Sequence, residues 1–307
     1  MQYWPRKRAG RPTARIRNFP ANTGPTLGGF AAYKVGMTQI LAMDNKPTSL
    51  SKGQQVSVPV TILECPPITI IAVKLYTRSP YGVKCVGQIT SDKQSKELAR
   101  RIPIAKKQPT NPPMQKIDEV RILAHTQPKL TTIGKKTPEM LEFSVGGKTP
   151  EEKLTNAKNL LGKDITIQDV FKEGQFVDVT SVTKGKGVQG PIKRFGIMLR
   201  AHKSEKTKSG PGSLGPWHGP RTYRVAHAGQ TGYQQRTEHN KQIINISTTP
   251  EKINPTSGFV RYGLIKNNYI LLKGSIGGAA KRLITLTHPR RITPKPEQLT
   301  IQKVNLR

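Results

Sequence analysis

The sequence predicts a mainly β protein with an inserted α+β subdomain and long basic extensions. Three observations lead to this fold class. Apolar and polar residues alternate through several short segments, which is typical of half-buried β-strands. One acid-rich stretch carries a clear helix signal. Two other stretches are rich in Lys, Arg, Gly and Pro and hold too few apolar residues to build a core.

Positive charge dominates the composition. The 307 residues include 51 Lys and Arg against 18 Asp and Glu, a formal net charge of +33, and only 34% are hydrophobic. A field of this sign needs a polyanion, and nucleic acid is the first expectation. No apolar run approaches the roughly 20 residues of a membrane span, and no signal peptide follows the basic start. We therefore expect neither a transmembrane nor a secreted protein, with no membrane partner.

Residues 1–26 are predicted to form an extended basic N-terminal arm. The first acidic residue of the chain is Asp44, and prolines and glycines interrupt any helical or strand period before it. With almost nothing apolar to bury, the arm is expected to become ordered on a partner. Its candidate nucleic-acid contacts are Trp4, Arg6, Arg8, Arg11, Arg15 and Arg17.

Residues 27–90 change to a period of two, and strands are expected at 30–40, 56–62, 68–75 and 83–89. Residues 91–164 are predicted to be an inserted α/β subdomain, which together with Asp169 holds ten of the 18 acids. Within it, Thr149, Pro150 and Glu152 form a capping box that predicts a helix over 150–161. Gly162 is expected to end that helix.

Residues 165–197 return to strand character, with a strand expected at 175–182. A long basic loop carrying Trp217 is expected over 198–240, and a basic, proline-broken tail over 290–307. Residues 241–289 should complete the β-structure, with strands at 243–246, 259–265, 269–273 and 282–286 and a tight hairpin at Asn267-Asn268.

Two segments partly match nucleotide-binding motifs, but each lacks residues that the motif requires. Gly185, Gly187 and Gly190 match G-x-G-x-x-G, but proline and a run of bases follow where a long helix and an acid should stand. A flexible turn that brings basic side chains to phosphates is the better interpretation, through Lys184, Lys186, Lys193 and Arg194. The Gly147-Lys148-Thr149 end of a Walker A loop lacks its first glycine, where Glu142 stands.

The histidines of the loop region raise the alternative of an RNA-modifying enzyme or nuclease. His202, His218, His227 and His239 share a segment with Glu205 and Glu238, but two acids among twelve bases are a poor supply of metal ligands. Gly/Pro-rich sequence also gives no rigid scaffold for a nucleophile. We therefore expect no catalytic residue, no metal, no cofactor and no small-molecule substrate. A DNA-compacting protein is a third hypothesis.

Trp217 is the strongest single candidate in the loop. It lies among small residues between Gly210 and Pro220, close to Arg221 and Arg224. Neighbours this small and basic cannot bury a Trp side chain in the core of the chain. A flat aromatic ring among cations is expected to stack on a base or to wedge into an RNA fold.

Several motifs in order resemble the L-three family of universal large-subunit ribosomal proteins. The resemblance is carried by residues 29–38, 184–190 with 193–196, 215–218, and 228–233 followed by Arg236-Thr237-Glu238. The insertion and the Trp-bearing loop are similar to the archaeal and eukaryotic form, and the stop at Arg307 favours the archaeal one. Gln234-Gln235 departs from eukaryotic members, which typically have a histidine after the tyrosine.

The resemblance implies a six-stranded translation-factor-like β-barrel, built from residues 27–90, 165–197 and 241–289. It also implies binding to 23S-type rRNA near its 3′ end, early action in subunit assembly and a loop that reaches toward the peptidyl transferase centre. The protein would be a cytoplasmic structural element beside neighbouring ribosomal proteins, and not a homo-oligomer. Further expected rRNA contacts are Arg200, His202, Lys203, Trp217, His218, Arg221, Arg224 and Arg236. Cys65 and Cys85 are expected to stay reduced.

Overall fold

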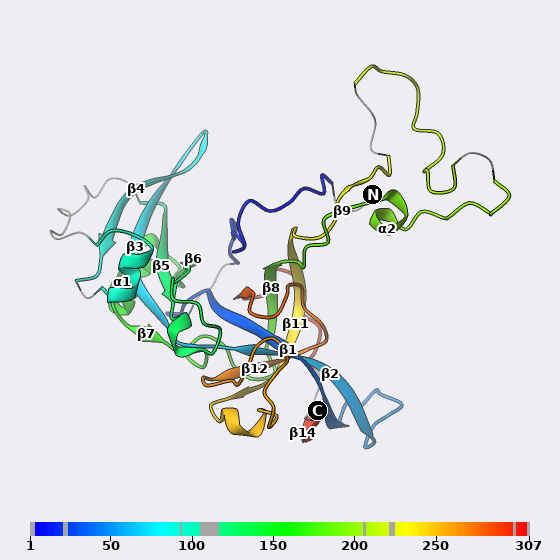
Figure 1. The fold of residues 1–307 in the computed structure, drawn as a ribbon. Helices are drawn as coiled ribbons and strands as arrows, with labels where there is room; N and C mark the ends of the chain where they lie inside the picture. The colour runs from blue at the N-terminus through cyan, green and yellow to red at the C-terminus, as the bar shows by residue number, and fades with distance from the viewer. Residues whose placement is uncertain are drawn as a thin grey trace.

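The computed structural model describes residues 4–20, 24–92, 94–104, 117–204, 207–220, 225–296 and 299–305. The described chain is mainly β, with two larger antiparallel sheets, one small sheet and few helices (Figure 1). The mainly β prediction is therefore confirmed.

The first sheet has seven strands in the order β13-β8-β11-β12-β2-β1-β14. Their bounds are β1 Gly29–Asp44, β2 Gln55–Glu64, β8 Phe176–Val182, β11 Gln235–Ser247, β12 Tyr269–Lys273, β13 Leu283–Thr287 and β14 Leu299–Asn305. Strand β1 pairs β13 as well as β2. Six strands therefore pair in a cycle, from β1 through β2, β12, β11, β8 and β13 back to β1. Strand β14 pairs with β1 outside this cycle.

Strand β1 is long enough to pair with two different strands along the same edge. Its first part, 29–33, pairs β13, and its last part, 39–44, pairs β14. Between them the register with β2 shifts at Lys34/Gly36, an irregularity that bends a strand and increases its twist. Side chains of this sheet fill the core, where Phe30, Ile62 and Leu286 are fully buried.

The second sheet has five strands, with β3 at its centre. Their bounds are β3 Ile68–Ser79, β4 Gly82–Thr90, β5 Glu119–Thr126, β6 Met140–Ser144 and β7 Asp164–Ile165. Helix α1, Pro150–Leu160, packs against β3 and β5 and buries Ala157. Short 3₁₀ helices lie at Lys96–Arg100, Pro128–Leu130 and Pro250–Lys252.

Residues 27–90 do not form one group of strands, as was expected, because β3 and β4 belong to the second sheet. They were expected beside the strands of the first sheet, but β3 pairs β4, β5 and β7 in the second sheet. Pro66 and Pro67, which lack a backbone N–H, separate β2 from β3 and end the first-sheet pairing. The apolar run from Ile68 to Val73 fits the interior of either sheet, so periodicity could not choose between them.

Helix α1 confirms the capping-box prediction. The Thr149 hydroxyl accepts a hydrogen bond from the Glu152 amide at 3.2 Å, and the Glu152 carboxylate accepts one from the Thr149 amide at 3.4 Å. Gly162 follows with a φ of +74°, and a Cβ there would meet the Ser91 hydroxyl. A left-handed backbone and this close approach both favour glycine at the end of the helix.

Two expectations in the last third of the chain are wrong. Residues 259–265 form no strand, only an isolated bridge between Phe259 and Gly263. Asn267 does not supply a positive φ; its amide and side chain instead bind the buried Glu64 carboxylate. Residues 299–305 of the basic, proline-broken tail form β14 on the edge of β1, a strand that the sequence did not predict.

Two further observations bear on the class of protein. In the part of the chain that the structure describes, no helix has both the length and the apolar character needed to cross a bilayer. Cys65 is a buried free thiol and Cys85 an exposed one, so the two are unpaired as predicted.

Candidate nucleic-acid interface

The long basic loop leaves the first sheet through a narrow neck. Strand β9, Val188–Gln189, pairs antiparallel with β10, Gly229–Gln230, and helix α2, Pro191–Phe195, follows β9. Helix α2 has only five residues and ends at Gly196, which has a φ of +70°. The G-x-G-x-x-G segment therefore contains strand β9 and is followed by a five-residue helix, not by the long helix of a dinucleotide-binding fold.

Beyond the neck, the loop extends away from both sheets (Figure 1). The described residues of the loop between 197 and 228 form no helix or strand. Trp217 is 91% exposed there, and Met198 is 89% exposed. The chain's own core thus does not bury this Trp side chain, in agreement with the expectation from its small neighbours.

Arg194 joins the two sides of the neck. Its guanidinium donates hydrogen bonds to the carbonyl oxygens of His227 at 2.9 Å, Ala228 at 3.3 Å and Gln230 at 3.2 Å. A further bond reaches the carbonyl of Arg6 in the arm at 3.2 Å. Burial, and then the charge of Arg6, lower the pKa of Arg194. Most donors of this expected phosphate contact are therefore already used within the chain.

Arg6 connects the arm to the same place. Its guanidinium lies 4.3 Å from the centre of the Phe195 ring, and Arg194 lies 5.1 Å from the same ring. Arg6 also donates to the carbonyl of Arg194. Cation–π contacts of this kind are worth ~0.5–1 kcal/mol at exposed sites. Phe195 thus holds the start of the arm against the neck.

The arm continues along the beginning of β11. The Ala9 amide donates to the Tyr233 carbonyl at 2.8 Å, while Arg8 and Arg282 lie 5.0 and 5.1 Å from the centre of the Tyr233 ring. Further along, the Gln235 side chain binds the backbone N–H and C=O of Arg15. These contacts give the arm partners inside the chain, which the expectation of ordering by an outside partner did not include.

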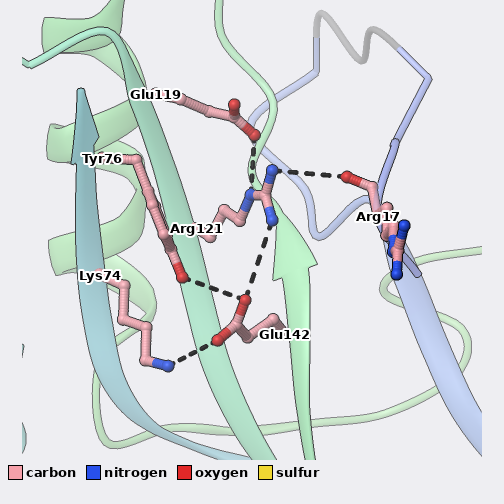
Figure 2. Close-up of polar contacts among 6 residues, drawn as sticks. All are labelled: Arg17, Lys74, Tyr76, Glu119, Arg121 and Glu142. Atoms are coloured by element: carbon pink, nitrogen blue, oxygen red, sulfur yellow. Dashed lines mark hydrogen bonds and ion pairs between the residues drawn. The ribbon is translucent and has the colours of Figure 1, made fainter. Parts of the chain in front are cut away.

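The end of the arm reaches the second sheet at Arg121. Figure 2 shows the Arg121 guanidinium between two carboxylates, 2.8 Å from Glu119 and 3.9 Å from Glu142, with a further bond of 3.5 Å to the Arg17 carbonyl. Lys74 pairs with Glu142 at 2.5 Å, and the Tyr76 hydroxyl donates to the same carboxylate at 3.1 Å.

This cluster has a defined charge state. Burial acts to raise the pKa of Glu142, but Lys74, Tyr76 and Arg121 together outweigh it and lower that pKa. Burial, followed by the charge of Glu142, raises the pKa of Tyr76 to about 12. Near neutral pH the carboxylate is therefore ionised and the phenol is protonated. The cluster fixes the position of Arg121, which in turn holds the arm.

The residues predicted to contact RNA do not lie together at one point, and they differ in how exposed their side chains are. Exposed side chains along the arm, neck and loop are Trp4, Arg8, Arg11, Arg15, Arg17, Lys184, Lys186, Lys193, Arg200, His202, Lys203, Trp217 and His218. Arg6, Arg194 and Arg236 are half-buried, and Arg236 donates to the Gln234 side chain at 2.8 Å. Arg221 and Arg224 lie outside the described residues.

Sequence reasoning missed the residues that position the arm. Gln235, Arg282 and Arg121 each contact it from a different strand or strand end, and none belongs to a charge run or a motif with known chemistry. The Gln234-Gln235 departure was noted, but nothing in the sequence indicated that Gln235 would face Arg15. Such long-range pairings depend on the topology, which a local pattern does not contain.

Among the described residues of the histidine-rich segment, His239 has a structural partner. His239 binds Asp178 at 2.7 Å, but Asp178 is fully buried and also accepts the amides of Asn240 and Arg290. The Asp178 carboxylate therefore has a structural role, because it accepts the His239 ring N–H and the two backbone amides. Among the described residues, which exclude Glu205, no group of three or more His, Cys, Asp or Glu side chains is placed to bind a metal.

Comparison with known proteins places the chain in a family. The family model for ribosomal protein L3 matches residues 1–307. The large ribosomal subunit protein uL3 of Methanosphaera stadtmanae is 46% identical over 295 residues, which cover 92% of this chain and 88% of that protein. The proteins of the same name from Methanothermobacter thermautotrophicus and Methanocaldococcus jannaschii are 44% and 42% identical, covering 96% and 99% of this chain and 91% and 93% of their own lengths. The chain belongs to the ribosomal protein L3 family, and its relatives named here are archaeal.

Proposed function

We propose that this chain is a structural constituent of the large ribosomal subunit that binds 23S-type rRNA through its arm and loop. The observation that carries the proposal is the row of exposed cations from Arg8 to Arg17 and from Lys184 to Lys203, attached to a folded β body. The family is one of ribosomal structural proteins rather than enzymes, which decides against the RNA-modifying or nuclease alternative. Its expected place is the cytoplasm, where archaeal large subunits are found.

The body supplies rigidity. The pairing cycle of β1, β2, β12, β11, β8 and β13 supports a six-stranded barrel of the translation-factor type. The second sheet, from β3 to β7, would be the inserted unit, so that the insertion begins after Pro67 rather than at 91.

The extensions supply affinity. Each Lys or Arg that neutralises an rRNA phosphate releases condensed counterions, so binding is strong at low salt and weakens as salt rises. Because the arm is already held at Phe195, Tyr233 and Gln235, part of its ordering entropy is lost before RNA binds. The family resemblance implies a site near the rRNA 3′ end and action early in assembly, and a pre-organised arm is suited to such early binding.

The loop supplies reach. Trp217 is nearly fully exposed on a segment that extends from the neck, away from the sheets (Figure 1). An exposed aromatic side chain on a basic loop is suited to stacking on an unpaired base. Together with the family, this supports a loop that enters the rRNA and reaches toward the peptidyl transferase centre, with Trp217 close to its tip.

A native lysate resolved on a sucrose gradient, with and without ribonuclease, tests the proposal. Stoichiometric co-sedimentation with the large subunit that persists through a high-salt wash and disappears after ribonuclease is the expected result. A peripheral electrostatic binder would dissociate in salt. Sedimentation with the nucleoid would favour the DNA-compacting hypothesis, and sedimentation as a free small protein would contradict the proposal.

A further inference from the structure

A polar pocket of about 340 Å³ lies between the arm and the first sheet. Its lining includes Arg15, Arg17, Arg290, Thr180, Thr237 and Thr287, and no acidic side chain. These residues come from the arm, from three strands of the sheet and from the segment after β13. The pocket therefore exists only because the arm lies along the sheet, and no single motif of the sequence contains it.

The backbone at each arginine is held by the body. Gln235 accepts the Arg15 amide at 3.1 Å and donates to the Arg15 carbonyl at 2.8 Å. Arg121 donates to the Arg17 carbonyl at 3.5 Å, and Asp178 accepts the Arg290 amide at 3.1 Å. All these bonds use backbone atoms of the three arginines, so the guanidinium groups themselves are not engaged by them.

The three guanidinium groups are exposed and have no intramolecular partner among the described residues. Arg121, by contrast, is paired with Glu119 and Glu142. Asp178 is the nearby carboxylate, but its oxygens already accept three donors, from His239, Asn240 and Arg290. Three like charges around one pocket repel one another, and an anion bound between them would remove that repulsion.

The floor of the pocket carries hydroxyl groups. Those of Thr180 and Thr237 lie 3.2 Å apart and bond to each other. The Thr287 hydroxyl has no partner among the described residues, although the residue is only 3% exposed. A hydroxyl both donates and accepts, which matches the 2′-hydroxyl of a ribose better than it matches an anion alone.

We propose that this pocket holds the sugar-phosphate backbone of an RNA strand, with Arg15, Arg17 and Arg290 on phosphate oxygens and the Thr287 hydroxyl on a ribose 2′-hydroxyl. The inference rests on the proposed rRNA binding and assigns it a specific place. Guanidinium groups bind phosphate through two parallel N–H donors. A single carboxylate can pair with only one or two guanidinium groups, whereas consecutive phosphates of one strand can pair with all three. RNA is therefore favoured over an acidic peptide.

Nuclear magnetic resonance of the full chain with isotope-labelled arginine tests the pocket directly. The probes are octauridylate and its deoxyuridine counterpart, which differ only in the 2′-hydroxyls. We expect octauridylate to shift the Nε–Hε signals of Arg15, Arg17 and Arg290 and to bind several-fold more tightly than the deoxy probe. Arg290→Gln should lower the slope of log affinity against log salt by ~0.7, the value of one phosphate contact with a single strand.

Two variants separate the pocket from general electrostatics. Arg78→Gln removes another exposed charge, on β3 and outside the pocket, and should weaken octauridylate binding much less than Arg290→Gln. Thr287→Val keeps the shape and should abolish the preference for the ribose probe while leaving deoxy binding unchanged. Thermal melts that match the wild type confirm that the variants are folded.

Three results would overturn the pocket: equal losses in Arg290→Gln and Arg78→Gln, no ribose preference in the wild type, or the same arginine shifts with octaglutamate at equal affinity. The proposed function is judged separately. Wild-type chain that still co-sediments with the large subunit keeps that function even when the pocket fails, whereas chain that never does so removes both.

Discussion

The guanidinium of Arg6 lies 4.3 Å from the centre of the Phe195 ring, so the start of the arm and the neck of the loop meet although they are far apart in sequence. Arg194, the residue before Phe195, donates to the Arg6 carbonyl and to three carbonyls on the opposite side of the neck. Two basic extensions that look independent in the sequence therefore share one anchor.

Replacing Phe195 with Leu should release the start of the arm. The change removes the aromatic face beneath Arg6, and a contact of ~0.5–1 kcal/mol corresponds to a roughly two- to five-fold change in the population of the released arm. Trypsin cleavage within residues 6–17 should accelerate by that factor while the body remains intact. Val188→Ala, at an exposed position of the same neck, is the matched control, and an equal rate in both variants would show that Phe195 does not hold the arm.

Replacing Arg194 with Lys should open the neck without changing the net charge. A lysine ammonium cannot reproduce the planar set of donors that Arg194 directs at several carbonyls. Hydrogen exchange at Gly229 and Gln230 should accelerate, while the salt dependence of RNA binding stays the same. The neighbouring Lys193→Gln should give the reverse, with unchanged exchange and a shallower salt slope, because Lys193 is exposed. Identical behaviour of the two variants would contradict the structural role of Arg194.

Local pattern predicted the elements of this fold but not how they assemble. The alternation over 56–62 and the capping box at Thr149 are short-range signals, and both appear in the structure at the expected places. The sheet to which β3 belongs is a long-range choice, and the sequence signal was the same for either sheet. The same reason explains Asn267, whose amide is directed at Glu64 by packing and not by turn chemistry.

The candidate interface was predictable in composition and unpredictable in geometry. A basic segment shows which residues can meet phosphates, and exposure agrees for Lys193 and Arg200. Composition does not show which guanidinium groups are already used. Arg194 binds carbonyls of its own chain, whereas the guanidinium of Arg290, which no motif indicated, lies beside the arm without a partner among the described residues. That distinction depends on contacts between distant segments.

The cluster around Arg121 predicts a loss of stability in acid. Its carboxylate Glu142 has a folded-state pKa below its ordinary value of 4.5, since Lys74, Tyr76 and Arg121 together outweigh the effect of burial. A depressed carboxyl pKa contributes stability that is fully present above the unfolded pKa and is lost as the pH falls through the folded one. The free energy of unfolding should therefore fall below about pH 4.5 in the wild type. Denaturant titrations across that range should show a flatter profile in Glu142→Gln, with Glu151→Gln, at an exposed position of α1, as the control. Parallel profiles in the wild type and Glu142→Gln would mean that this carboxylate does not carry the acid sensitivity.

Trp217 should matter for function and not for folding. Its side chain is 91% exposed, so Trp217→Ala removes almost no buried apolar area, and the melting temperature of the isolated chain should match that of the wild type. Phe30→Ala, at a fully buried position of β1, should by comparison destabilise the body by ~3–5 kcal/mol. Large subunits carrying Trp217→Ala should assemble in near-normal amounts but engage tRNA or translation factors less well, because the loop loses its only described tryptophan. The two readouts are the subunit profile on a gradient and tRNA binding to purified subunits. A variant that unfolds in isolation would place Trp217 in a core, and normal tRNA and factor binding would remove its proposed role near the peptidyl transferase centre.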